Sequence, residues 1–140
     1  MDFNAQQLRA DALIKDGRYK YTVLDAREKR SGAGNDMLNL KLSLEVDGRR
    51  VVQFDSLILI PKMFWKVEHF CQSAGIPEKI EEGRLMAQDC LGKEGYLDLC
   101  QKVDQQSGEL INQVKDYVKP EDLSQPTPQD NAFIDDDIKI

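Results

Sequence analysis

The clearest structural signal in the chain is LNLKLSLEV, residues 38–46. Apolar residues occupy every second position and alternate with Asn39, Lys41, Ser43 and Glu45. Successive side chains of a β-strand point to opposite faces, so this alternation gives one buried and one polar face. At helical spacing the same apolar residues would spread around the whole helix. The stretch therefore predicts a half-buried strand.

The flanking segments predict two more strands. Asp47-Gly48 is a two-residue hairpin signal, after which residues 49–59 form the returning strand. Residues 18–29 are rich in β-branched and aromatic side chains, and a turn cluster at 31–36 separates them from the central strand. Residues 1–15 are weakly patterned and fit a short helix or an arm.

Further along, Pro61 suits a helix start, and residues 62–74 carry apolar side chains at helical spacing. Residues 78–86 predict a short helix or an irregular connection. Residues 96–103 and 110–118 predict the last two strands.

The predicted order, β-β-β-α-β-β, is that of the OB-fold, a five-stranded Greek-key barrel. We therefore expect a mainly β protein with a helix between the third and fourth strands. An α+β sandwich or another small barrel are the alternatives. No periodicity remains after Pro120, so we expect one domain in residues 1–119 and a disordered acidic tail in residues 120–140.

The charge of the chain is unevenly distributed. The net charge is −6, but residues 121–140 hold six acidic side chains and one basic side chain. The other 120 residues have a net charge of only −1 and leave room for a basic face. No apolar run is long enough to span a bilayer and no secretory signal is visible, which favours a cytoplasmic protein without membrane contact.

Signals for catalysis and cofactors are weak. Cys71, Cys90 and Cys100 form no CxxC pair, so neither a disulfide framework nor a zinc site is expected. His69, the only histidine, falls in an apolar helical pattern typical of a packed residue. Phosphate-binding, hydrolase and metalloprotease motifs are absent from the sequence. We expect no enzyme, no cofactor and no metal.

Basic and aromatic residues are interleaved in the first three predicted strands. Cations hold phosphates and flat rings stack on bases, which is the mixture that single-strand binders use. Core packing of the rings and solvated basic edges are the alternative explanation. The candidate DNA-binding residues are Tyr19, Lys20, Tyr21, Arg27, Lys29, Arg30, Lys41, Arg49, Arg50, Phe54 and Trp65. Trp65 lies on the predicted helix, where a place in the core or a cap is favoured.

The extreme C-terminus combines an acidic run with apolar residues. This pattern favours docking, in which the apolar residues enter a pocket and the acids meet a basic rim. The same residues would also fit the chain's own basic groove, and an incidental end is the simpler alternative. The candidate partner-binding residues are Phe133, Ile134, Asp135, Asp136, Asp137, Ile138 and Ile140.

Several short motifs together resemble a known family. They are Gly17-Arg18-Tyr19, Ser31-Gly32, Asp55-Ser56-Leu57, Trp65-Lys66, Phe70-Cys71, Ala74-Gly75-Ile76 and Gly92-Lys93-Glu94-Gly95, with Gly108 and Val114. Over residues 16–118 this pattern resembles phage-borne single-stranded DNA-binding proteins of the OB type. The tail separately resembles the acidic tips of bacterial single-stranded DNA-binding proteins, although Lys139-Ile140 replaces their usual Pro-Phe ending.

The resemblance implies sequence-independent binding of single-stranded DNA in phage or mobile-element replication or recombination. The implied setting is a bacterial or phage-infected host cytoplasm. Replication or recombination proteins would be recruited by the tail. The protein would act either as a monomer or as a homo-oligomer. The alternative function is a protein-interaction adaptor that uses the barrel as a scaffold without DNA affinity.

Overall fold

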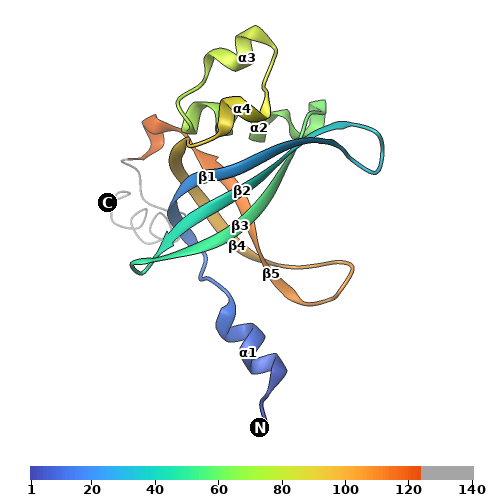
Figure 1. Ribbon diagram of the computed structural model, residues 1–140, viewed down its shortest axis with the longest axis vertical. Coiled ribbons are helices and arrows are strands. Elements are labelled where there is room, and N and C mark those ends of the chain that lie inside the picture. Colours follow the sequence, from blue (N-terminus) through green and yellow to red (C-terminus); the bar gives the residue numbers. More distant parts are fainter. Residues whose placement is uncertain (124–140) are drawn as a thin grey trace, which may run out of the picture.

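The computed structural model describes residues 1–123, which form a mainly β protein with five antiparallel strands in one sheet (Figure 1). The strands are β1 (Gly17–Arg30), β2 (Asp36–Val46), β3 (Arg49–Ile58), β4 (Glu94–Val103) and β5 (Leu110–Val118). Their order across the sheet is β3-β2-β1-β4-β5. All five predicted strands are confirmed, each within two residues of its expected bounds.

Short helices gather at the two ends of the sheet. The helical segments are α1 (Ala5–Ala12), η1 (Pro61–Met63), α2 (Phe64–Ser73), α3 (Glu78–Glu82), α4 (Ala87–Cys90) and η2 (Pro120–Asp122). Figure 1 shows α2, α3 and α4 at one end and α1 at the other. The predicted helix between β3 and β4 is confirmed as η1 followed by α2. Within residues 1–123, none of these helices has the length and apolarity needed to cross a membrane.

The structure continues past the predicted start of the tail. Residues 120–122 form η2, and the guanidinium of Arg18 donates a hydrogen bond of 3.4 Å to the carbonyl of Asp122. The turn is therefore tied to β1, which the loss of apolar periodicity after Pro120 did not predict. The rest of the predicted tail lies outside the described residues.

The core follows the predicted alternation. Leu38, Leu40, Leu42 and Leu44 are at most 2% exposed, as expected for the inner face of β2. On the outer face of β2, Lys41 is exposed, as predicted. Strand β2 therefore separates a continuous apolar interior from a polar outer face.

Helix α2 closes one end of the interior through an aromatic cluster. The ring of Phe70 lies 6.4 Å from that of Tyr21 and 5.0 Å from that of Tyr117, measured between centroids. A side chain at Gly95 on β4 would place its Cβ 2.6 Å from the Ser73 hydroxyl oxygen. Glycine at this position therefore lets α2 approach the sheet closely.

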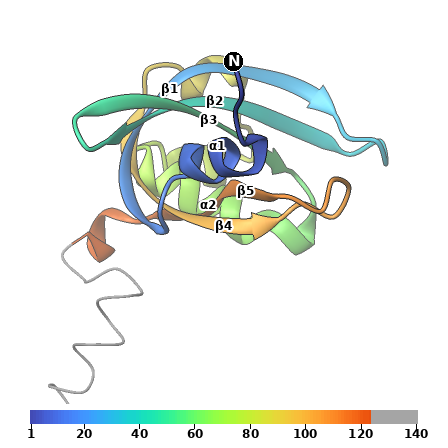
Figure 2. The ribbon, with the colours of Figure 1, turned by 90° about the horizontal axis from the view of Figure 1, so that it is seen from below.

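The sheet curls so that its two edge strands approach each other (Figure 2). The side-chain amide of Gln53 on β3 donates to the carbonyl of Asn112 on β5 at 3.2 Å. The hydroxyl of Tyr117 on β5 donates to the carboxylate of Asp55 on β3 at 2.7 Å. Side-chain hydrogen bonds therefore link β3 and β5 across the opening of the sheet.

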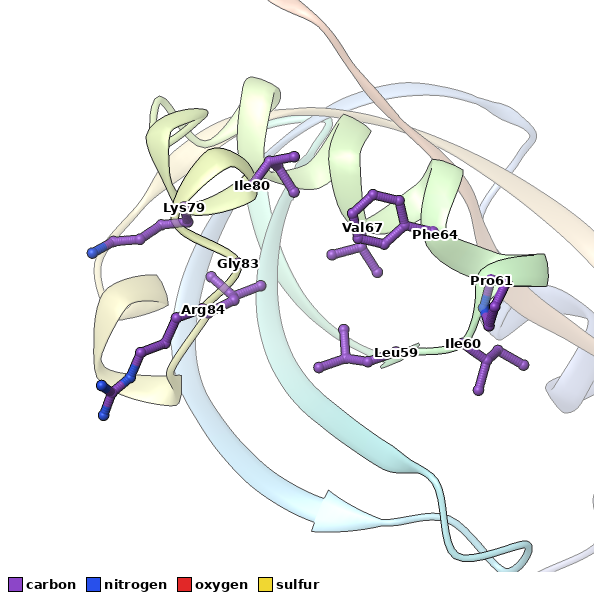
Figure 3. A pocket seen from close by; sticks show the side chains of 10 residues that line it. Leu59, Ile60, Pro61, Phe64, Val67, Lys79, Ile80, Gly83 and Arg84 are labelled. Atoms are coloured by element: carbon purple, nitrogen blue, oxygen red, sulfur yellow. The ribbon is translucent and has the colours of Figure 1, made fainter.

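The helical end of the sheet also contains an open pocket of about 540 Å³ between α2 and α3 (Figure 3). Apolar side chains from η1, α2 and α3 line most of it. The pocket is separate from the outer face of β1, β2 and β3, where the candidate nucleic-acid interface lies.

Candidate nucleic-acid interface

The outer face of β1, β2 and β3 brings together four of the predicted DNA-binding residues. Lys41 on β2 stands opposite Asp25 on β1 and opposite Phe54 on β3. Residues directly opposite in an antiparallel pair share a face, so these side chains are neighbours. Arg27 and Lys29 follow along β1, and all five line a groove of about 410 Å³.

A β-bulge in β1 creates this arrangement. The pairing of β1 with β2 shifts between Val23 and Asp25, so Leu24 is an extra residue. Before the bulge the odd-numbered Tyr21 and Val23 face the core, whereas after it the odd-numbered Arg27 faces outward. The bulge therefore turns the basic half of β1 toward the groove, in keeping with the tendency of bulges to redirect side chains.

The groove carries a positive charge that is open to solvent. It holds three cations, Arg27, Lys29 and Lys41, and one acid, Asp25. The Nε of Arg27 lies 3.3 Å from a carboxylate oxygen of Asp25. The Arg27 side chain nevertheless stays 73% exposed. Cations placed in this way remain accessible to phosphate groups.

An aromatic ring stands among these cations. Phe54 is 65% exposed although it occupies a strand position in a folded domain. On the same face, the hydroxyl of Ser56 donates to the side-chain oxygen of Asn39 at 2.7 Å, and this bond holds the Asn39 side chain that lines the groove. An exposed phenyl ring next to cations is suited to stack on a base.

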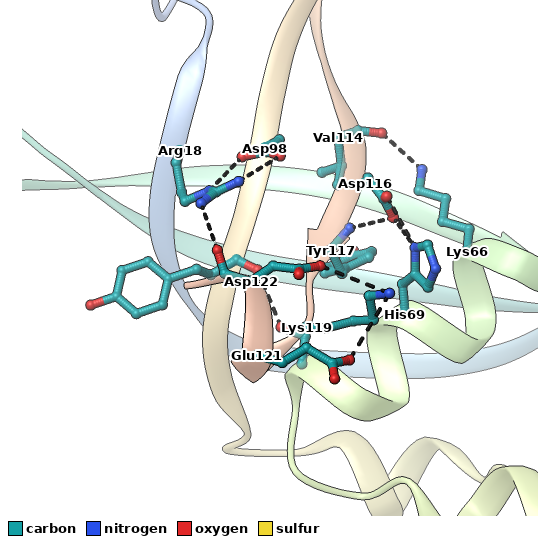
Figure 4. Close-up of polar contacts among 12 residues, drawn as sticks. Arg18, Lys66, His69, Asp98, Val114, Asp116, Tyr117, Lys119, Glu121 and Asp122 are labelled. Carbon is teal, nitrogen blue, oxygen red and sulfur yellow. Dashed lines mark hydrogen bonds and ion pairs between the residues drawn. The ribbon is translucent and has the colours of Figure 1, made fainter. Parts of the chain in front are cut away.

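A buried polar network on the inner face of the sheet supports β3, and Figure 4 shows the hydrogen bond from Lys66 to Val114 within it. The ammonium of Lys66 on α2 donates to the carboxylate of Asp55 at 3.2 Å and to the carbonyl of Val114 at 2.8 Å. The second carboxylate oxygen of Asp55 accepts from Tyr117. Burial raises the pKa of the Asp55 carboxyl above its usual value, although Lys66 and Tyr117 act in the opposite direction. This network fixes the strand that presents Phe54.

Tyr21 is a correction to the sequence-based prediction. Its side chain is 0% exposed and packs between Phe70 and Tyr117, and its hydroxyl lies 3.0 Å from that of Ser73. Burial raises the pKa of the Tyr21 hydroxyl well above its ordinary value. A ring on the inner face cannot reach a bound strand, so Tyr21 belongs to the core.

Tyr19 and the two arginines of the hairpin lie toward another part of the molecule. The hydroxyl of Tyr19 donates to the carbonyl of Lys15 at 2.7 Å. Tyr19 and Arg49 line a separate cavity of about 540 Å³ near the N-terminal segment. Arg49 and Arg50 are both exposed beside the turn between β2 and β3. These residues do not line the groove.

The remaining predicted residues are also dispersed. Lys20 lies 3.5 Å from Glu94 on β4, and Arg30 donates to the carbonyl of Gly34 at 3.2 Å. Trp65 is 43% exposed on α2, so it does not lie in the core, which was one of the two places favoured from the sequence, and it does not line the groove. The seven partner-binding candidates in residues 133–140 lie outside the described residues.

His69 makes a defined polar contact next to Trp65. Its Nδ1 lies 2.9 and 3.0 Å from the two carboxylate oxygens of Asp116 (Figure 4). Its ring centroid is 5.8 Å from that of Trp65. Among residues 1–123, no group of three or more His, Cys, Asp or Glu side chains is placed to hold a metal ion.

Three groove residues were not predicted from the sequence. Asp25 and Leu40 line the groove, and Asn39 contributes its amide. The alternation of β2 had already placed Asn39 on the polar face, so the sequence carried a signal for it. Asp25 was not identifiable, because its direction depends on the bulge.

A family model described as "Protein of unknown function (DUF669)" matches residues 1–128. The match covers most of the chain, so the protein belongs to this family. No curated protein matches the chain.

Proposed function

We propose that this DUF669 protein binds single-stranded DNA without sequence preference along the outer groove of β1, β2 and β3. The observation that carries the proposal is the exposed ring of Phe54 beside Lys41, with Arg27 and Lys29 in the same groove. Cations that follow a phosphate backbone and a ring that accepts any base give affinity without reading sequence.

The strand order supports assigning the sheet to the OB-fold. In our proposal, the five strands form a Greek-key barrel with α2 between β3 and β4 and with β3 and β5 as the facing edges. OB-folds bind oligonucleotides on the face of their second and third strands. The groove here lies on that face, since Lys41 and Phe54 come from β2 and β3.

The biological role we propose is non-enzymatic and follows from this binding. The protein would cover single strands during phage or mobile-element replication or recombination in a bacterial cytoplasm. Its acidic C-terminal residues, 133–140, would recruit replication or recombination proteins. An adaptor without DNA affinity is the competing function.

Titration of a fluorescently labelled dT oligonucleotide with the full chain tests the proposal, with anisotropy as the readout. We expect binding at low salt and a linear fall of log affinity with log salt, by about 0.7 for each phosphate neutralised. A duplex of the same length is the control and should bind more weakly, because its bases cannot stack on Phe54. Failure to bind dT at low salt would overturn the proposal and favour the adaptor.

A further inference from the structure

The pocket between α2 and α3 is an apolar site that the DNA groove does not explain (Figure 3). Its apolar lining includes Leu59, Ile60, Phe64, Val67, Ile80 and Leu85. Phe64 is 40% exposed and Leu59 is 38% exposed. A pocket with a volume of about 540 Å³ and a mostly apolar lining has the size and the chemistry of a ligand-binding site.

Two cations stand at the rim of this pocket. Figure 3 shows Lys79 and Arg84 extending to the same side, away from the apolar lining. Lys79 is paired with Glu82 at 3.5 Å and with Asp89 at 3.6 Å. The Nε of Arg84 donates to the sulfur of Met86 at 3.4 Å, and Arg84 forms no ion pair with a carboxylate of residues 1–123. The guanidinium of Arg84 can therefore donate hydrogen bonds to the carboxylate of a bound segment.

We propose that this pocket receives the C-terminal segment of the same chain, Phe133–Ile140. Phe133 and Ile134 would enter the apolar pocket, and the carboxylates of Asp135–Asp137 would face Arg84. The sequence of this segment, apolar residues followed by three acids, complements the pocket in both respects.

The connecting chain is long enough for this docking. Nine residues lie between Leu123, where the described structure ends, and Phe133, so ten Cα–Cα steps connect the two. Fully extended, ten residues span about 33–36 Å. A domain of this length has a radius of gyration of about 14 Å, so the segment reaches most of its surface. A short tether also gives an effective concentration in the millimolar range, which favours docking within one chain.

The chemistry of the pocket suits this segment better than the DNA groove does. The groove offers cations, but only Leu40 and Phe54 provide apolar lining. The segment carries Phe133 and three isoleucines, which would remain in water if only its acids were bound. Docking in the pocket would bury the apolar residues of the segment and pair its acids at the same time. While docked, the segment would be unable to bind partner proteins.

Methyl NMR of the full chain tests this proposal. We compare the wild type with Phe133→Ala, and use Thr127→Ala as the matched control in the connecting chain. Phe133→Ala should shift the methyl resonances of pocket residues such as Leu59, Val67 and Ile80. Thr127→Ala should leave them in place.

A pocket variant gives an independent reading. Leu59→Ser should move the Ile134 methyl resonance to its random-coil position, whereas Leu91→Ser should not. Leu91 is a matched control because it is 49% exposed and lies outside the pocket.

The other outcomes overturn the proposal. Shifts on β1, β2 and β3 around Lys41 would place the segment in the DNA groove. Pocket shifts that disappear on dilution would assign the site to the segment of a second copy. No shift in any variant would leave the segment undocked. None of these readings depends on DNA binding, so the proposal stands or fails separately from the proposed function.

Discussion

The side chain of Asn112 on β5 hydrogen bonds to both backbone polar groups of Ile14. Its Nδ2 donates to the Ile14 carbonyl at 2.8 Å, and its Oδ1 accepts from the Ile14 amide at 2.9 Å. Gln101 on β4 donates to the same carbonyl at 3.0 Å. Ile14 is only 8% exposed, so these bonds hold the residues before β1 against the open end of the core. The Asn112 side chain thus makes the two hydrogen bonds to the Ile14 backbone that a neighbouring strand would otherwise make.

Asn112→Ala should lower the free energy of unfolding by about 1–3 kcal/mol, because it leaves the Ile14 amide without its partner and the Ile14 carbonyl with Gln101 alone. Urea denaturation followed by Trp65 fluorescence measures this loss. Gln106→Ala, in the exposed loop between β4 and β5, is the control and should have little effect. Equal stability of the two variants would show that water replaces the Asn112 bonds at no cost.

The sequence predicted the strands well because their signals are local. The alternation in residues 38–46 and the Asp47-Gly48 turn define β2, β3 and the hairpin between them. The bulge at Leu24 was not predicted, because neither glycine nor proline marks it. A signal was present in hindsight: the apolar positions change from odd to even numbers between Val23 and Ala26.

The direction of individual aromatic side chains was harder to predict than the strands. Tyr21, Phe54 and Trp65 were all stacking candidates, although a place in the core or a cap was favoured for Trp65, and of the three only Phe54 lies in the groove. Tyr21 is buried because it precedes the bulge on the inward face. The position of Trp65 depends on how α2 packs on the sheet, which no local pattern specifies.

Phe54→Ala should weaken dT binding by about 1–3 kcal/mol, the usual effect of losing one stacking ring. The free energy of unfolding should change little, because the side chain is 65% exposed. Anisotropy titration and urea denaturation measure the two quantities. Phe3→Ala is the matched control, since Phe3 is 71% exposed and lines neither the groove nor the pocket between α2 and α3. Similar losses of affinity in both variants would argue against stacking on Phe54.

Lys41→Gln should reduce the salt dependence of dT binding. Removing one phosphate contact lowers the magnitude of the slope of log affinity against log salt by about 0.7. Lys115→Gln, an exposed lysine on β5 outside the groove, changes the net charge equally and serves as the control. If both variants changed the slope alike, the effect would come from net charge and not from a contact in the groove.

Asp55 should make the stability of the protein depend on pH. Burial raises the pKa of this carboxyl above 3.8 in the folded protein, against the opposing effects of Lys66 and Tyr117. The folded state therefore binds the Asp55 proton more tightly than the unfolded state does. The resulting stabilisation is complete below the unfolded pKa and is lost as the pH rises through the raised folded pKa.

Asp55→Asn removes this titration but keeps an oxygen that accepts from Lys66. Urea denaturation of both proteins from about pH 4 to pH 7 gives the unfolding free energy of each. The wild type minus Asp55→Asn difference should fall as the pH rises. Glu81→Gln, on the exposed surface of α3, controls for the loss of one negative charge. A difference that grew with pH would mean that Lys66 stabilises the Asp55 carboxylate by more than its burial costs, and the network beneath Phe54 would then act as a true ion pair.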